Sequence, residues 1–160
     1  MENGALLHQQ YEMIRGSRAV VLNFAEAHLA QQLTTPVPAY VNKSIAHLLV
    51  HNANVHLHWM ANFAMQLNIA YAEEADYPHI QSIRDLYTRI DHLVISFINH
   101  YESRLTETIN GTTASGKSGQ STPLEIFTHV ATHEFHHKGQ ILSMFRLLGH
   151  TPPDTDVIRF

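Results

Sequence analysis

The stretch THEFHHKGQ (residues 132–140) contains two histidines four residues apart, His133 and His137, with Glu134 between them. This H-E-x-x-H pattern is typical of zinc peptidases, in which two imidazoles bind one metal ion and the carboxylate deprotonates a water molecule on it. Residues four apart lie on the same face of a helix, so both histidines can share a cation. Metal binding is therefore the first chemistry that this spacing indicates.

The peptidase interpretation needs a third ligand further along the chain, and the sequence does not provide it. No glutamate follows Glu134, and position 143, where the longer peptidase motif has a histidine, is Ser143. No segment predicts the sheet along whose edge such enzymes bind their substrates. Because Glu134 lies ~100° around the helix from His133, we expect a solvated or intersubunit carboxylate rather than a general base.

A second run of histidines offers the third ligand instead. The stretch SIAHLLVHNANVHLHW (residues 44–59) places His47 and His51 four residues apart, and His129 extends the first pair by one turn. Two histidine-lined helix faces can meet inside a helical bundle and hold a metal ion. A single histidine on an apolar face is more often a hydrogen-bonded core residue. A dimerisation module with polar core histidines and no metal is therefore one alternative.

Four segments show the three- and four-residue apolar repeat of amphipathic helices: residues 5–30, 43–67, 80–105 and 123–148. The last segment has the clearest ends, because Thr122 and Glu125 can form a capping box and Pro123 suits a first helical turn. Gly149 can end it. With no convincing alternating strand, the sequence predicts an all-α four-helix bundle with the histidine pairs on its second and fourth helices.

The composition limits the number of domains, the ligands and the partners. A chain of 160 residues with 44% hydrophobic and 15% charged residues predicts a single domain over residues 1–160. Without cysteine, a metal must be held by nitrogen or oxygen, and histidine, at 14 residues, outnumbers Lys and Arg together at 10. The net charge of −4 argues against nucleic-acid binding. No stretch of ~20 apolar residues or secretory signal is present, so we expect a cytoplasmic protein without membrane contact.

The stretch GTTASGKS (residues 111–118) matches the phosphate-binding loop G-x-x-x-x-G-K-[ST]. Such a loop follows a buried strand and leads directly into a helix, so that backbone N–H groups converge on phosphate. Here an amphipathic helix precedes the stretch, and the next helix begins only at Pro123. We therefore interpret residues 110–120 as a flexible Gly/Ser connector.

These features resemble the DinB-like family of four-helix bundles, also described as YfiT-like metal-dependent hydrolases. In that family the second helix carries a histidine followed eight residues later by an aromatic residue, here His51 and Trp59. The fourth helix carries H-x-x-x-H-[RK]-G-Q-[IV], here HEFHHKGQI (residues 133–141), and the closing L-G-x-x-P-P-x-x-D pattern is similar to LLGHTPPDTD (residues 147–156). Carried over by position, the family's metal triad falls on His51, His133 and His137. Lys138 stands where the family more often has Arg, which keeps the charge but loses the forked donor.

The resemblance implies a metal-dependent enzyme acting on a small molecule. It would be either an S-transferase using a low-molecular-weight thiol, such as bacillithiol or mycothiol, or a hydrolase, and it would form a homodimer. Three neutral histidines leave an open position on a divalent ion, where water or a thiol loses its proton near neutral pH. Zinc and nickel are the first candidates, with iron and manganese as further ones. The alternative is a non-catalytic metal-binding stress-response scaffold, in which His47 or His129 adds a fourth ligand.

Overall fold

The computed structural model describes residues 2–160 and contains four long helices and one small sheet. The helices are α1 (Glu2–His28), α2 (Ile45–His56), α3 (Ile80–Tyr101) and α4 (Pro123–Leu147). Helix α2 continues directly into a π-helical segment, η2 (Leu57–Ala64), and two short 3-10 turns are η1 (Pro38–Tyr40) and η3 (Glu74–Asp76). The four predicted helices are thus confirmed, the second as an α-helix followed by a π-helix. None of the described helices is both long enough and apolar enough to cross a membrane.

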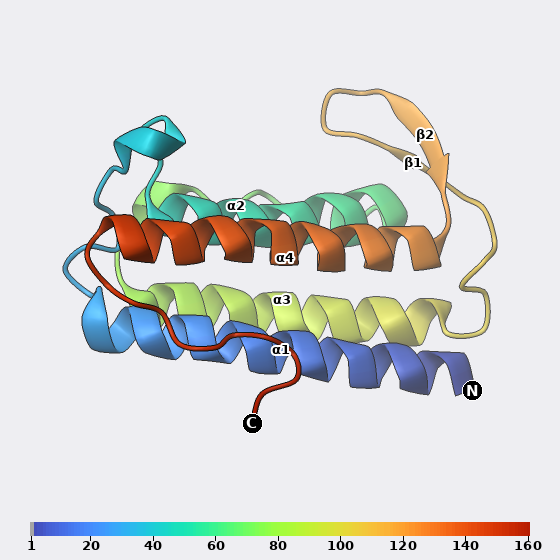
Figure 1. The fold of residues 1–160 in the computed structure, drawn as a ribbon. Coiled ribbons are helices and arrows are strands. Elements are labelled where there is room, and N and C mark those ends of the chain that lie inside the picture. The colour runs from blue at the N-terminus through green and yellow to red at the C-terminus, as the bar shows by residue number, and fades with distance from the viewer. Residues whose placement is uncertain (1) are drawn as a thin grey trace.

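The four helices lie side by side around one apolar core (Figure 1). Helices α1 and α4 run in one direction, and α2 and α3 run in the other (Figure 1). Helix α1 contacts α3 and α4, and α2 contacts the same two helices, so each helix has two neighbours. Apolar side chains from all four helices fill the core, among them Val21, Val50, Phe97 and Phe145. This packing places α2 and α4, which carry the histidine pairs, next to each other and antiparallel.

Local capping chemistry fixes the ends of the two helices that carry the histidines. At the start of α4, Thr122 Oγ1 accepts from the backbone N–H of Glu125, whose carboxylate accepts from the N–H of Thr122. This confirms the predicted capping box. Gly149 follows α4 with φ of 91°, a left-handed conformation in which glycine avoids the steric cost of a side chain. At the start of α2, Ser44 Oγ accepts from the N–H of His47.

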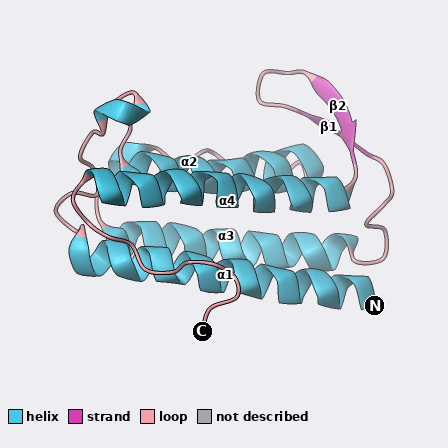
Figure 2. Cartoon of the chain, in the orientation of Figure 1, coloured by secondary structure: helices cyan, strands magenta, loops and turns pink. Residues whose placement is uncertain are grey.

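The connector between α3 and α4 forms a hairpin, so the expectation that it contains no strand is wrong (Figure 2). Strand β1 (Ile109–Thr112) pairs antiparallel with β2 (Ser118–Ser121), with Gly111 opposite Gly119. Gly111 packs against Phe63, where an added Cβ would lie 2.5 Å from the phenylalanine carbonyl oxygen. Gly111 therefore allows the hairpin to pack closely against η2. The phosphate-loop interpretation is excluded, because residues 111–118 belong to this hairpin and α4 begins later.

Residues 65–79, here called the return segment, lead from η2 back to the start of α3. Because α2 and α3 run in the same direction, the chain must travel back along α2 before α3 can begin (Figure 1). Two asparagine side chains hold the segment through hydrogen bonds. Asn62 bonds the backbone N–H and C=O of Ile69, and Asn54 bonds the same two groups of Ala72. The return segment thereby brings Glu74 to the start of α2.

Candidate metal centre

Three histidines from two helices converge on one point. One ring nitrogen each of His51 on α2 and of His133 and His137 on α4 lies within 4.8 Å of the other two. Their ring centroids are 5.3 Å (His51–His133), 4.9 Å (His51–His137) and 4.4 Å (His133–His137) apart. Three nitrogens that bind one ion at ~2.1 Å in a tetrahedral site lie roughly 3.4 Å apart, which is the separation that these three nitrogens must reach to bind it. The structure thus brings together the three residues that the sequence indicated.

The hydrogen bonds of these rings fit a metal ion. Nδ1 of His137 lies 2.6 Å from Oε1 of Gln140, so in the neutral ring Nδ1–H donates and Nε2 keeps its lone pair for a cation. Nδ1 of His133 is buried and has no hydrogen-bond partner within residues 2–160. A buried polar atom without a partner lowers stability. Coordination of an ion by this nitrogen would give the atom a partner.

The electrostatic environment keeps all three rings neutral. Burial, supported by the neighbouring His137, lowers the pKa of His133 to about 4. Burial also lowers the pKa of His51, and it lowers the pKa of His137 although the hydrogen bond to Gln140 acts in the opposite direction. Only a neutral imidazole can bind a metal ion, so the site is prepared for a cation at neutral pH.

The two remaining candidate histidines flank this group without belonging to it. The ring of His47 is stacked 6.5 Å from that of His51, and its Nδ1 donates to Glu74 of the return segment over 2.8 Å. The ring of His129 lies 5.8 Å from that of His133 and contacts Trp59 at 5.2 Å. Both therefore occupy supporting positions one turn away from the triad.

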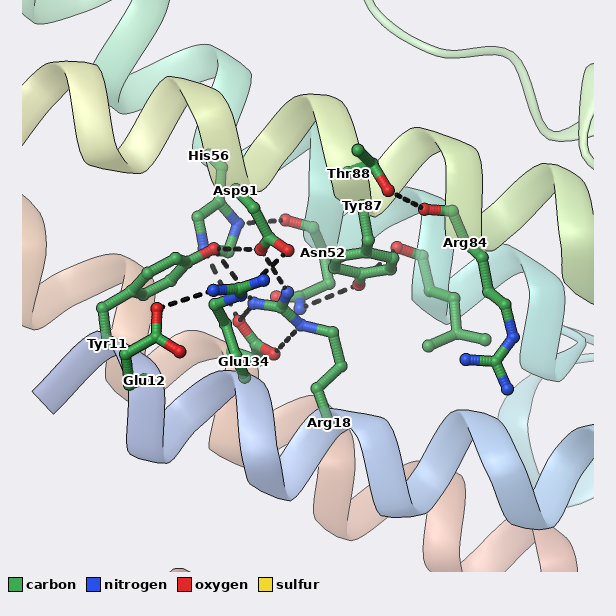
Figure 3. A network of polar contacts seen from close by, with 12 residues as sticks. Tyr11, Glu12, Arg18, Asn52, His56, Arg84, Tyr87, Thr88, Asp91 and Glu134 are labelled. Atoms are coloured by element: carbon green, nitrogen blue, oxygen red, sulfur yellow. Dashed lines mark hydrogen bonds and ion pairs between the residues drawn. The ribbon is translucent and has the colours of Figure 1, made fainter. Parts of the chain in front are cut away.

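Glu134 is not the solvated or intersubunit carboxylate that its position in the motif suggested. It is only 6% exposed, and its two oxygens accept from Nε of Arg18 at 2.6 Å and from Nη2 at 3.0 Å (Figure 3). Glu134 does point away from the histidine face, as expected. This direction leads into the interior, where Arg18 of α1 provides the guanidinium. Glu134 is therefore occupied by an ion pair and does not play the part of a peptidase base.

Glu134 belongs to a buried polar network that connects all four helices (Figure 3). We call this network the polar hub, and it consists of Tyr11 and Arg18 from α1, Asn52 and His56 from α2, Tyr87 and Asp91 from α3, and Glu134 from α4. Asp91 accepts from Nη1 of Arg18 and from the hydroxyl of Tyr11, both at 2.7 Å. The hub adjoins the triad, because residues of both line one small cavity.

The space between the hub and the triad is small. A cavity of about 20 Å³ is lined by residues of both, including Asn52, Glu134 and His137. Roughly one water molecule fits such a volume, so this cavity does not accommodate a substrate. His51, in contrast, is exposed. A small molecule would therefore approach the triad from the outer surface of α2 and α4.

Three residues that contact His137, Glu134 or His47 were missed as functional residues in the sequence. Gln140 follows His137 by one turn, a spacing at which helical side chains interact, so a signal for it was available. Arg18 and Glu74 come from distant segments and gave no local signal.

Comparisons with known proteins agree with the fold. The chain is similar to the protein DinB of Bacillus subtilis (strain 168), with 28% identity over 120 residues that cover 71% of this chain and 69% of that protein. The crystal structure of a DinB-like protein, YjoA, from Bacillus subtilis shares the fold, with a TM-score of 0.62 at 18% identity, over 91% of this chain and 97% of that one. A model of the DinB family matches residues 1–160. The predicted resemblance is thereby confirmed, and the chain belongs to the DinB family.

Proposed function

We propose that this protein is a metal-dependent enzyme for a small molecule, either an S-transferase that uses a low-molecular-weight thiol or a hydrolase. The observation that carries the proposal is the convergence of three imidazole nitrogens within 4.8 Å, from two neighbouring helices. The four helices act as a four-helix bundle that holds these rings on its outer surface. Zinc or nickel is our first choice of metal, and iron or manganese would also accept three imidazoles.

Each residue of the triad has a defined task in this proposal. His137 would offer Nε2, because its Nδ1 is engaged with Gln140. Burial keeps His133 neutral, and His51 joins the two from α2 while remaining exposed to an incoming molecule. When bound, a divalent ion lowers the pKa of a coordinated thiol or water molecule. Because the chain has no cysteine, a reacting thiol would come from outside.

The second candidate function is a non-catalytic metal-binding stress-response scaffold. The observation in its favour is that His47 and His129 flank the triad, one on each helix. If either imidazole supplied a fourth nitrogen, no position would remain for a substrate. The hydrogen bond from Nδ1 of His47 to Glu74 is compatible with this role, because it leaves Nε2 of His47 free, as the Gln140 contact does for His137.

The test begins with elemental analysis of protein purified without an affinity tag. The metal-loaded protein is then screened for thiol conjugation and for hydrolysis, with His133→Ala as the matched control. Stoichiometric metal and an activity that the variant lacks would support the enzyme. Metal held by four protein nitrogens, without turnover, would support the scaffold. Absence of stoichiometric metal after reconstitution with each of the four ions would contradict both.

The proposal includes a cytoplasmic homodimer. A groove between α1 and α4 is lined by apolar side chains, including Met13, Phe135 and Val157, and Leu6 and Met13 are at least half exposed. Closed two-fold pairs are the commonest soluble oligomers, and burying such a face removes apolar surface from water. We therefore place the dimer interface on this groove.

A further inference from the structure

Each helix that carries the triad has a member of the polar hub directly after a histidine of the triad. Asn52 follows His51 on α2, and Glu134 follows His133 on α4. Neighbouring helical residues point ~100° apart, so a rotation of the helix that moves one side chain must move the other. Asn52 is 3% exposed and Glu134 is 6% exposed, whereas His51 lies at the surface. The contacts of the hub therefore influence the directions in which the triad histidines point.

The hub restrains the rotation of α4 more strongly than that of α2. Two charge-assisted hydrogen bonds in a fork fix both the position and the plane of the Glu134 carboxylate against Arg18. Arg18 is itself held from α3, because its Nη1 donates to Asp91 at 2.7 Å and its guanidinium carbon lies 4.4 Å from the ring centroid of Tyr87. An apolar contact tolerates small shifts and rotations, whereas this ion pair has one preferred geometry.

We propose that the Arg18–Glu134 ion pair is a positioning element of the metal centre. It sets the rotation of α4 about its own axis, so that His133 and His137 face His51. This inference rests on the proposed function, since it assigns a task to residues that support the triad and touch neither metal nor substrate. It also gives Glu134 a role that the sequence-based expectation of a solvated or intersubunit carboxylate did not include.

A purely stabilising role would have a different signature. A buried ion pair often adds no net stability compared with well-packed apolar residues of similar size, because two charges must be removed from water. The double variant Arg18→Met/Glu134→Leu should therefore fold with a melting temperature close to that of the wild-type protein. The double variant loses the directional contact between residues 18 and 134. Asp91 keeps its bonds to Tyr11 and Arg15, so no charge is left without a partner.

The experiment measures zinc affinity by competition with a chromophoric chelator, together with the melting temperature of the metal-free protein. For the double variant we expect about 10-fold weaker zinc binding, the effect typical of losing a residue that orients ligands. The visible spectrum of the cobalt(II)-loaded protein should also change, since it reports the coordination geometry. A pair that only stabilises the fold would leave both affinity and spectrum unchanged.

Two single variants and one control complete the design. Glu134→Gln keeps the shape and one oxygen acceptor and should retain part of the affinity, whereas Arg18→Lys loses the fork and should weaken binding. The control is Glu26→Gln, which removes an exposed ion pair between α1 and α3, Arg84 Nη2 to Glu26 Oε2 at 2.8 Å, and should bind zinc normally. If the double variant does not fold, the zinc affinities of the two single variants test the positioning role.

The outcomes separate this inference from the proposed function. Wild-type zinc affinity in the folded double variant, or in both single variants, would overturn the positioning role and leave the proposed function intact. A wild-type protein that binds none of the four metals would overturn both. Weaker zinc binding with a changed cobalt spectrum and an unchanged melting temperature is the result that we expect.

Discussion

The Oε1 atom of Gln140 lies 2.6 Å from Nδ1 of His137, one turn further along α4. This contact fixes the neutral tautomer of the ring and leaves the lone pair of Nε2 free for a metal ion. Histidines that bind metals usually donate their second ring N–H to such an acceptor, and losing the acceptor weakens metal binding 10- to 100-fold, roughly.

We therefore expect Gln140→Leu to weaken metal affinity about 10-fold while hardly affecting the melting temperature of the metal-free protein. Gln140→Glu is the matched variant, because it keeps an oxygen at the same place and should bind at least as tightly as the wild type. A competition titration with a chelator measures both. Equal affinities for Gln140→Leu and the wild type would show that the contact does not orient the ring.

Substitution of the triad should remove the metal. His51→Ala, His133→Ala and His137→Ala each leave two imidazoles, which are insufficient for stoichiometric retention through dialysis. Elemental analysis after dialysis measures the effect. His129→Ala, outside the convergent group, serves as the control and should keep the metal. Loss of metal from this variant as well would show that the site has a fourth protein ligand.

The stability of the metal-free protein should fall in acid. The folded pKa of His133 is about 4, whereas an unfolded histidine titrates near ~6.5. Between these two values the unfolded chain binds a proton that the folded chain does not, so stability is highest above pH ~6.5 and decreases until the pH reaches about 4. Urea unfolding of the wild type and of His133→Ala across this range measures the effect, which should be smaller in the variant.

Bound metal should raise the melting temperature in a pH-dependent way. At pH ~7.5 a chelator should lower the melting temperature without abolishing the transition, because the apolar core remains. The difference should shrink as protons displace the ion below pH ~5. The low pKa values of the triad delay this displacement compared with free histidines. Identical melts with and without chelator at pH ~7.5 would mean that the histidines hold no ion.

The hairpin offers a matched pair of glycines. Gly111→Ala places a methyl group 2.5 Å from the carbonyl oxygen of Phe63, whereas the nearest contact for Gly119→Ala is an ordinary 3.7 Å. We expect the first variant to lose about 1–3 kcal/mol of unfolding free energy and the second to lose little. Denaturant unfolding measures both, and similar values would show that the hairpin can move away from η2.

The dimer can be tested on the groove between α1 and α4. Met13 is 50% exposed there, and Met13→Glu should yield a folded monomer, because a charge would be buried without a partner in the interface. Leu147→Glu, outside this groove and 57% exposed, should leave the assembly unchanged. Sedimentation at micromolar concentration distinguishes the two, and a monomeric wild type would rule out the dimer.

The helix ends and the histidine pair on α4 could be predicted because their signals are local, whereas the choice of His51 as the third residue followed from the family resemblance. Thr122 and Glu125 lie three residues apart and cap the same turn, and His133 and His137 share a helix face at any packing angle. The role of Glu134 could not be predicted in this way. Its direction around α4 followed from helix geometry, but its partner, Arg18, lies 116 residues away and comes from α1.

The hairpin and the return segment were missed for a related reason. Residues 110–120 are rich in glycine and serine, which favour neither strand nor helix, and Gly111 packs closely against Phe63 in the distant segment η2. Likewise, Asn54 and Asn62 are unremarkable polar residues on a helix until the chain returns beside them. In both cases a contact distant in sequence decides the local structure.

The turn of the hairpin has a practical use. Ser115 is exposed in it, and at the next residue, Gly116, an added Cβ would have nothing within 4 Å. Because the chain contains no cysteine, Ser115→Cys would give the molecule one thiol and hence a unique attachment point for a fluorophore. Energy transfer from such a dye to cobalt(II) at the triad would then report metal exchange in real time.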